Sequence, residues 1–188
     1  MLKQEYSRRK KEIKTRLKEF SKVNDDDVFY ELCFCLLTPQ SNAKKCDKAV
    51  KLLREKDFLN RNINPSGYLK TNTRFHNNKS RYLLELKKRY PNIELEREFL
   101  VKNVKGLGFK EASHFLRNIG YKDLAILDRH ILKNLKKYNA IKEIPSTLTP
   151  KKYLEIEEKF KQFSKKVKIP MDELDLLFWS METGEVFK

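Results

Sequence analysis

Apolar residues recur along the chain at intervals of three and four positions, which is the period of an amphipathic α-helix. Two clear stripes are Phe29, Leu32, Cys33, Leu36 and Ala112, Phe115, Leu116, Ile119. No convincing run of alternating apolar and polar residues indicates a strand. The pattern therefore predicts an all-α fold.

Helix starts are marked by capping residues and prolines. The sequence predicts helices beginning after Asp25–Asp27, after Ser41 (over Ala43–Leu53), after Asn77 or Asn78, after Pro150 and at Pro170. The last of these helices presents two faces. One face is apolar and consists of Leu174, Leu177, Phe178 and Met181, and the other consists of Asp172, Asp175 and Trp179.

The charge of the chain gives information about its binding partner rather than about its fold. The 188 residues include 42 Lys and Arg against 26 Asp and Glu, a formal net charge of +16. Such an excess favours a polyanionic partner, although lysine-rich chains of other classes exist, so the site needs separate support. No run of eighteen apolar residues and no apolar leader segment occurs, so we expect no membrane association and a cytoplasmic protein.

Cysteine and histidine positions give no indication of a metal site. Cys33, Cys35 and Cys46 are odd in number and lack a CxxC spacing, and the three histidines show no paired spacing. We expect reduced cysteines in the core, no metal and no cofactor.

Gly106 and Gly108 bracket Leu107 between two helical stretches and predict a tight hairpin. Glycine at both positions would let a phosphate approach the backbone N–H groups that open the next helix, with Leu107 pointing inward. Lys105 beside the hairpin is a further candidate DNA contact. A purely structural turn is the alternative interpretation.

Lys110 lies in the first turn after the hairpin, where the helix dipole and nearby cations disfavour a further positive charge. A neutral amine there could attack an electrophilic sugar carbon. Asp128 follows 18 positions later, at the start of another predicted helix. Taken alone, Lys110 could be a solvated or phosphate-binding lysine and Asp128 a simple helix cap.

Five segments of the sequence form a recognisable pattern: GLGFKEASHFLRNIGY, AILDRHIL, LLTPQSNAKKC, RFHNNKSRY and DLLFWSMETGEVFK. With these segments the chain resembles the helix-hairpin-helix base-excision DNA glycosylases, and within them the archaeal and bacterial 8-oxoguanine DNA glycosylase/AP lyases of the second type.

The resemblance implies a two-lobed all-α fold with the active site in a cleft. We expect a middle lobe over 23–128, which ends in the helix-hairpin-helix at about 96–120, and a second lobe of 1–22 plus 129–188. The chain lacks the four C-terminal cysteines of the iron–sulfur branch of this superfamily, so we expect no cluster.

The resemblance also implies chemistry: excision of 8-oxoguanine through a Schiff base on Lys110, with Asp128 stabilising charge, followed by β-elimination. The expected partner is double-stranded DNA containing oxidised guanine, bound by a nucleoid-associated monomer.

Further roles follow for four residues. The resemblance places Gln40 in the duplex gap beside the orphaned base and Lys188 in the base pocket. Trp179 could stack on a flipped purine, and Asp175 could accept hydrogen bonds from the edge of that purine. Each could instead be an ordinary loop, core or terminal residue. Arg74, Lys79 and Arg81 could contact phosphates or simply form a solvated helix face.

Two alternative functions stay open. A glycosylase/lyase for oxidised pyrimidines would share Lys110 and Asp128 and differ in the base pocket. A non-catalytic helix-hairpin-helix DNA-binding module would share the hairpin and the charge, but would need neither residue.

Overall fold

The structure, a computed structural model, describes residues 2–188, and every regular element in that range is a helix. The predicted all-α fold is confirmed. The chain forms two compact units, a middle unit (Asn24–Phe115) and a terminal unit that combines the chain up to Val23 with Leu116–Lys188. The sequence places the boundary between the two lobes at residue 128. In the structure the chain passes from the middle unit to the terminal unit earlier, inside helix α7 (Phe109–Asn118). Among residues 2–188, none of the helices combines the length and the apolar composition that a membrane span requires.

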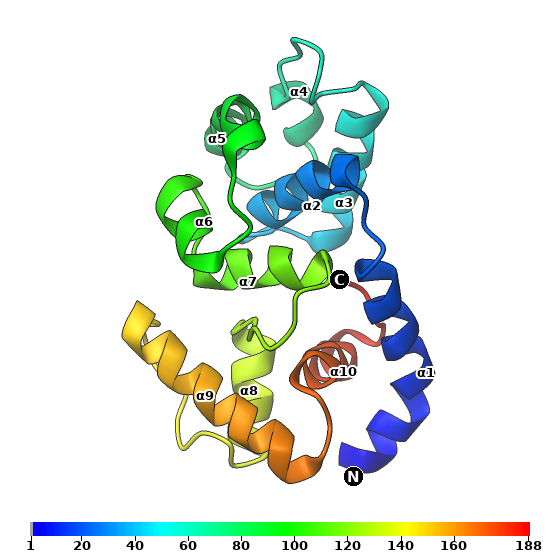
Figure 1. Cartoon of the computed structure of the whole chain (residues 1–188), viewed down its shortest axis with the longest axis vertical. Helices are drawn as coiled ribbons and strands as arrows, with labels where there is room; N and C mark the ends of the chain where they lie inside the picture. The colour runs from blue at the N-terminus through cyan, green and yellow to red at the C-terminus, as the bar shows by residue number, and fades with distance from the viewer. Residues whose placement is uncertain (1) are drawn as a thin grey trace. The chain divides into compact units, whose positions relative to one another are not determined.

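The middle unit is a cluster of short helices (Figure 1). Besides the start of α7, it contains α2 (Asp25–Leu37), α3 (Ala43–Glu55), α4 (Ser66–Leu69), α5 (His76–Arg89), the 3-10 turn η1 (Tyr90–Asn92) and α6 (Arg97–Asn103). Helix α2 contacts α3 and α5, and it is buried along most of its length. Phe29 of α2 packs against the rings of Phe58 and Tyr90, with ring centroids 6.1 and 4.9 Å away. This aromatic cluster stabilises the unit by removing apolar surface from water.

The terminal unit is built around the last helix (Figure 1). Besides the end of α7, it contains α1 (Leu2–Phe20), α8 (Arg129–Lys137), α9 (Pro150–Val167) and α10 (Met171–Thr183). Helix α10 contacts α1, α8 and α9. Phe178 of α10 stacks on Tyr138 at 5.7 Å and lies 6.1 Å from Phe160 of α9. The apolar face that the sequence indicates for α10 therefore forms the core of this unit.

Three of the expected helix caps are wrong by one to three residues. Helix α2 is capped by Asn24, whose side chain accepts from the N–H of Asp27, and α3 is capped by Asn42 rather than Ser41. Helix α5 starts at His76, so Asn77 and Asn78 lie inside it. A cap needs its oxygen within reach of the third helical N–H, and in α2 and α3 only the residue directly before the helix meets this condition. Asp25–Asp27 instead occupy the first turn of α2, where acidic side chains complement the helix dipole.

Candidate active site

The predicted hairpin between two helices is present, and it joins α6 to α7. Gly106 has φ of +93°, a conformation that glycine adopts without strain. A Cβ at this position would lie 2.6 Å from Cδ2 of Tyr82 in α5, so the ring also excludes any side chain there. Leu107 is buried, as expected for the residue between the two glycines. The hairpin is therefore fixed against α5 by close packing.

Lys105 extends from the hairpin and keeps most of its surface in solvent. Its side chain is 58% exposed, lies 5.8 Å from the centroid of the Tyr82 ring and forms a 3.8 Å ion pair with Glu85. An exposed ion pair of this length is weak, so it leaves the lysine available to a phosphate.

Lys110 is the second residue of α7 and is held by its neighbour Glu111. One oxygen of Glu111 lies 3.0 Å from Nζ of Lys110, and the other accepts from the N–H of Gly108 at 3.3 Å. This second contact is the backward half of a capping box, in which a glutamate three residues after the cap bonds the backbone of the cap residue. Glu111 was not predicted as a site residue, although its spacing from Gly108 is the signal that could have found it.

The turn that contains Gln40 joins α2 to α3. Gln40 has φ of +54°, and the Thr38–Asn42 segment is held by the buried ammonium of Lys79. The suggestion that Lys79 contacts phosphates is wrong, because its side chain points into the protein. Phe75, which was not predicted as a site residue, directly precedes α5 with φ of +57° and 53% exposure.

Asp128 caps α8 in the terminal unit, as its position predicts. One carboxylate oxygen accepts from the N–H groups of His130 and Ile131, both at 2.8 Å. The preceding segment is fixed by α9, because Ala125 donates its N–H to Glu157 at 2.8 Å and Leu127 donates to the hydroxyl of Tyr153 at 3.3 Å. The carboxylate of Asp128 is thus held in one orientation.

Asp175 and Asp172 on α10 are buried carboxylates. Burial raises the pKa of Asp175 to about 7, with the charge of Arg117 opposing this rise and those of Asp128 and Asp172 adding to it. Burial also raises the pKa of Asp172 to about 6. Arg117, which was not predicted from the sequence, lies 3.4 Å from Asp175. Asp175, which the sequence suggests as an acceptor of hydrogen bonds from the base, therefore lies beside the guanidinium group of Arg117.

Trp179 is half-buried on α10, one turn after Asp175. Its ring meets His130 of α8 edge to face, with centroids 5.2 Å apart and planes at 90°. His130 lies two residues after Asp128, so Trp179 and Asp128 border the same end of α8. Beyond α10 the tail turns at Gly184, buries Val186 and ends at the half-buried Lys188.

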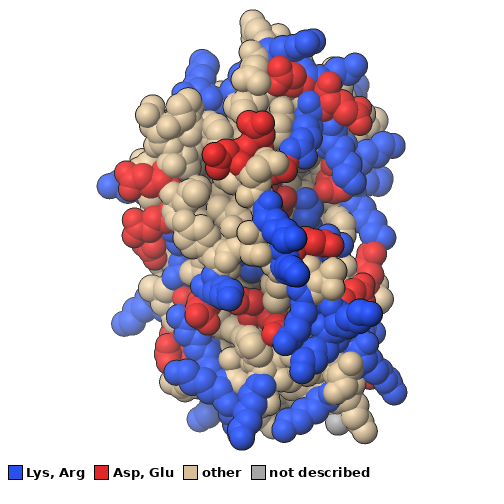
Figure 2. All heavy atoms as spheres, turned by 45° about the vertical axis from the view of Figure 1, so that its right-hand side comes forward, with Lys and Arg blue, Asp and Glu red and all other residues tan. Residues whose placement is uncertain are grey.

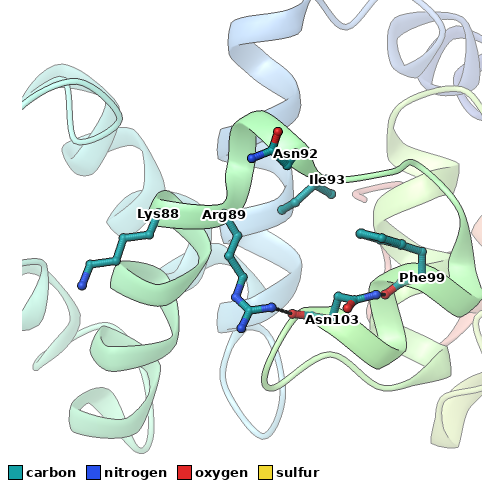
Figure 3. A pocket seen from close by; sticks show the side chains of 6 residues that line it. All are labelled: Lys88, Arg89, Asn92, Ile93, Phe99 and Asn103. Atoms are coloured by element: carbon teal, nitrogen blue, oxygen red, sulfur yellow. Dashed lines mark hydrogen bonds between the residues drawn. The ribbon is translucent and has the colours of Figure 1, made fainter.

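The middle unit also contains a cavity of about 210 Å³ (Figure 3). It is lined by Lys88, Arg89, Asn92, Ile93, Phe99 and Asn103. Arg89 turns toward Asn103 and donates to its carbonyl at 3.4 Å, while the Asn103 amide donates to Phe99 at 2.9 Å. None of the predicted site residues lines this cavity.

The three cysteines are buried and form no disulfide with one another, as expected from the sequence. Burial raises the pKa of Cys46 to about 11, which keeps this thiol protonated and unreactive near neutral pH. Within residues 2–188, no group of three or more His, Cys, Asp or Glu side chains is arranged to hold a metal ion.

Lysine and arginine side chains are spread over the face shown in Figure 2, with acidic side chains between them. The net charge of +16 thus produces a broadly basic surface on this face. Such a surface attracts a polyanion without specifying its sequence.

Residues 2–188 form only helices as regular elements, and the glycine hairpin leads into a helix with a lysine in its first turn, which defines a helix-hairpin-helix protein of the DNA-binding class. The 8-oxoguanine DNA glycosylase family model matches residues 13–169. The chain therefore belongs to that family.

Relatives from bacteria and archaea resemble the chain over nearly its whole length. A Fusobacterium nucleatum 8-oxoguanine DNA glycosylase/AP lyase is 45% identical, covering 97% of this chain and 94% of that protein. The crystal structure of the Methanocaldococcus jannaschii 8-oxoguanine glycosylase/lyase with a 15mer DNA containing 8-oxoguanine has a TM-score of 0.83 at 38% identity, covering 95% of this chain and 93% of that one. The Thermotoga maritima 8-oxoguanine DNA glycosylase has a TM-score of 0.89 at 31% identity, covering 100% and 96%.

Proposed function

We propose that this protein is a bifunctional DNA glycosylase/AP lyase that excises 8-oxoguanine from duplex DNA. The observation that carries the proposal is the hairpin with Lys110 in the first turn of the following helix, in a chain that belongs to the 8-oxoguanine DNA glycosylase family. A repair enzyme of this kind works where the chromosome is, which in a prokaryote is the nucleoid of the cytoplasm.

In the proposed reaction, Nζ of Lys110 attacks C1′ of the flipped nucleotide and the glycosidic bond breaks, so that the base leaves with the bonding electrons. Attack requires a neutral amine, so Lys110, which forms an ion pair with Glu111, must first lose a proton. The carboxylate of Asp128 stabilises the positive charge that develops on the sugar. Its fixed orientation on α8 supports this role, because a carboxylate that is already oriented needs no reorganisation during the reaction.

The lyase step uses the same lysine. The sugar ring opens at the C1′–O4′ bond, O4′ takes up a proton, and the lysine adduct becomes a Schiff base at C1′. The Schiff base acidifies the hydrogen at C2′, and loss of that proton lets the C3′–O bond break with the phosphate as leaving group. β-Elimination thus cuts the strand on the 3′ side of the lesion.

Base recognition is assigned to the terminal unit. Trp179 supplies a half-buried aromatic face for the flipped purine, Asp175 a carboxyl group for its edge, and Lys188 a further polar group at the end of the folded tail. Gln40 on its turn fills the gap in the duplex, and Lys105, Gly106 and Gly108 contact the DNA backbone.

The test compares duplexes that carry 8-oxoguanine, thymine glycol or an abasic site, each with and without borohydride. We expect excision of 8-oxoguanine, cleavage at both the resulting and the preformed abasic site, and a trapped covalent adduct. Lys110→Gln should abolish all three, while Lys122→Gln, the same change at an exposed lysine, should leave them intact.

Each alternative function has its own result in this assay. Faster processing of thymine glycol than of 8-oxoguanine would establish the oxidised-pyrimidine enzyme. Tight DNA binding without cleavage of any substrate would establish a non-catalytic module. Normal adduct formation by Lys110→Gln would show that another residue is the nucleophile.

A further inference from the structure

Lys79 is a lysine inside the protein core with all of its hydrogen-bonding capacity in use. Its side chain is buried, and Nζ donates to the carbonyl of Leu37 at 2.7 Å, the carbonyl of Pro39 at 2.8 Å and the hydroxyl of Ser41 at 2.8 Å. An ammonium group has three N–H donors, so none is left for a phosphate or for water. All three acceptors lie at the end of α2 or in the turn that contains Gln40.

Ser41 extends this network to a second turn. Its hydroxyl accepts from Nζ of Lys79, accepts from the backbone N–H of Arg74 at 2.9 Å and can donate to the carbonyl of Pro39 at 3.4 Å. A hydroxyl offers one donor and two acceptor sites, so Ser41 is also fully used. The two residues therefore link the turn before α3 to the turn before α5.

Both linked turns contain a residue in the left-handed region of backbone space. Gln40 has φ of +54° and Phe75, directly after Arg74, has φ of +57°. For a residue other than glycine this conformation costs about 1–2 kcal/mol, so it persists only where the surroundings hold it. The hydrogen bonds from Nζ of Lys79 to Leu37, Pro39 and Ser41 supply that restraint.

We propose that Lys79, together with Ser41, is a positioning residue that fixes the Gln40 turn in the conformation needed to fill the gap left by the extruded nucleotide. The proposal rests on the proposed glycosylase function for its consequence in DNA, but the link between the turns is a property of the protein alone. A lysine suits this place because three acceptors converge on one point, which the planar fork of arginine does not match. Burial lowers the pKa of Lys79, as expected for an ammonium group withdrawn from water.

The first experiment measures the turns without reference to any substrate. Amide hydrogen exchange is compared in the full-length wild type, Lys79→Met, Ser41→Ala and Ser41→Thr. We expect faster exchange over Thr38–Asn42 and at Arg74 in Lys79→Met and Ser41→Ala, with α9 unchanged, and wild-type protection in Ser41→Thr, which keeps the hydroxyl. Unchanged exchange in both Lys79→Met and Ser41→Ala would overturn the proposal.

The second experiment asks whether Lys79 acts through Gln40. Single-turnover excision of 8-oxoguanine is measured for Lys79→Met, Gln40→Ala and the double variant, with fluorescence of a 2-aminopurine beside the lesion as a readout of base extrusion. We expect each single variant to lose on the order of tenfold to a hundredfold in excision, as misplaced groups commonly do. The double variant should lose no more than Gln40→Ala alone, because both changes remove the same step. Additive losses would mean that Lys79 has a general structural role.

Two comparisons keep the result specific. Lys88→Met makes the same change at an exposed lysine of α5 and should excise normally. Cleavage at a preformed abasic site, where no base has to be extruded, should fall by less than excision in Lys79→Met. If Lys79→Met does not fold, a comparison of Ser41→Ala with Ser41→Thr provides the same test. A wild type that ignores 8-oxoguanine would refute the proposed function, whereas the hydrogen-exchange result would still decide the link between the turns.

Discussion

The carboxylate of Asp175 lies 3.4 Å from Nη1 of Arg117, and only 7% and 4% of these two side chains are exposed. Desolvation outweighs the attraction of the guanidinium, since the pKa of Asp175 is raised to about 7. This carboxyl group therefore holds a proton below about pH 7. The charged form of this buried pair therefore lowers the stability of the folded protein, because the cost of removing the two charges from water exceeds their mutual attraction.

The first prediction concerns the pH dependence of stability. Between the ordinary pKa of 3.8 and the folded value of about 7, the folded protein holds a proton on Asp175 that the unfolded chain has released. The free energy of unfolding should therefore fall as the pH rises through this window. Asp175→Asn cannot titrate and should flatten this part of the curve in urea unfolding at pH 5 and pH 8. Asp172→Asn, whose carboxyl has a folded pKa of about 6, should flatten a smaller part of it. If the unfolding free energy of Asp175→Asn changed with pH as steeply as that of the wild type, Asp175 would not be the group that titrates in this window.

The second prediction separates the helix-capping role of Asp128 from its proposed role in catalysis. Asparagine caps helices as well as aspartate does, so Asp128→Asn should keep the bonds to His130 and Ile131 with little change in unfolding free energy. It should lose on the order of a hundredfold or more in excision rate, because the negative charge is gone. Asp128→Ala should lose both the activity and about 1 kcal/mol of stability. Full activity of the stable Asp128→Asn protein would leave Asp128 with a capping role alone.

The third prediction tests the hairpin. Gly106→Ala places a Cβ 2.6 Å from the Tyr82 ring and forces a positive φ on alanine, so we expect a loss of about 1–2 kcal/mol and weaker DNA binding. Adding Tyr82→Ala removes the clash but not the strained φ and should restore only part of the binding. Gly67→Ala is the matched control, since a Cβ there meets no atom within 4 Å and α4 tolerates alanine. Equal behaviour of the two alanine variants in thermal unfolding and DNA titration would contradict this account.

The fourth prediction concerns the base pocket. Trp179→Ala removes the proposed stacking surface and should reduce excision of 8-oxoguanine more than cleavage at a preformed abasic site, which contains no base. Trp179→Phe keeps an aromatic face and should retain most of the activity. Lys188→Ala should reduce the ratio of 8-oxoguanine to guanine excision. These ratios are measured in parallel single-turnover reactions, and parallel losses on base-containing and abasic DNA would remove Trp179 from base recognition.

Local pattern was sufficient for much of the fold. The helical period, the glycine hairpin and the cap at Asp128 are short-range features, in which each residue acts on neighbours within about one turn. For the same reason the sequence indicated the order of hairpin, lysine and aspartate along the chain. It misplaced three helix caps by one to three residues, because the choice among nearby polar residues depends on backbone geometry.

By itself, the sequence determined the all-α class, the hairpin and the candidate pair Lys110 and Asp128. Only the tertiary structure decided that Lys79 is a buried anchor and that Arg117 faces Asp175, because these contacts join residues about 40 and 58 positions apart. A charged side chain has the same local signature whether it ends in water or in the core. Its role is set by which distant acceptors or charges folding brings around it, and by how far burial withdraws it from water.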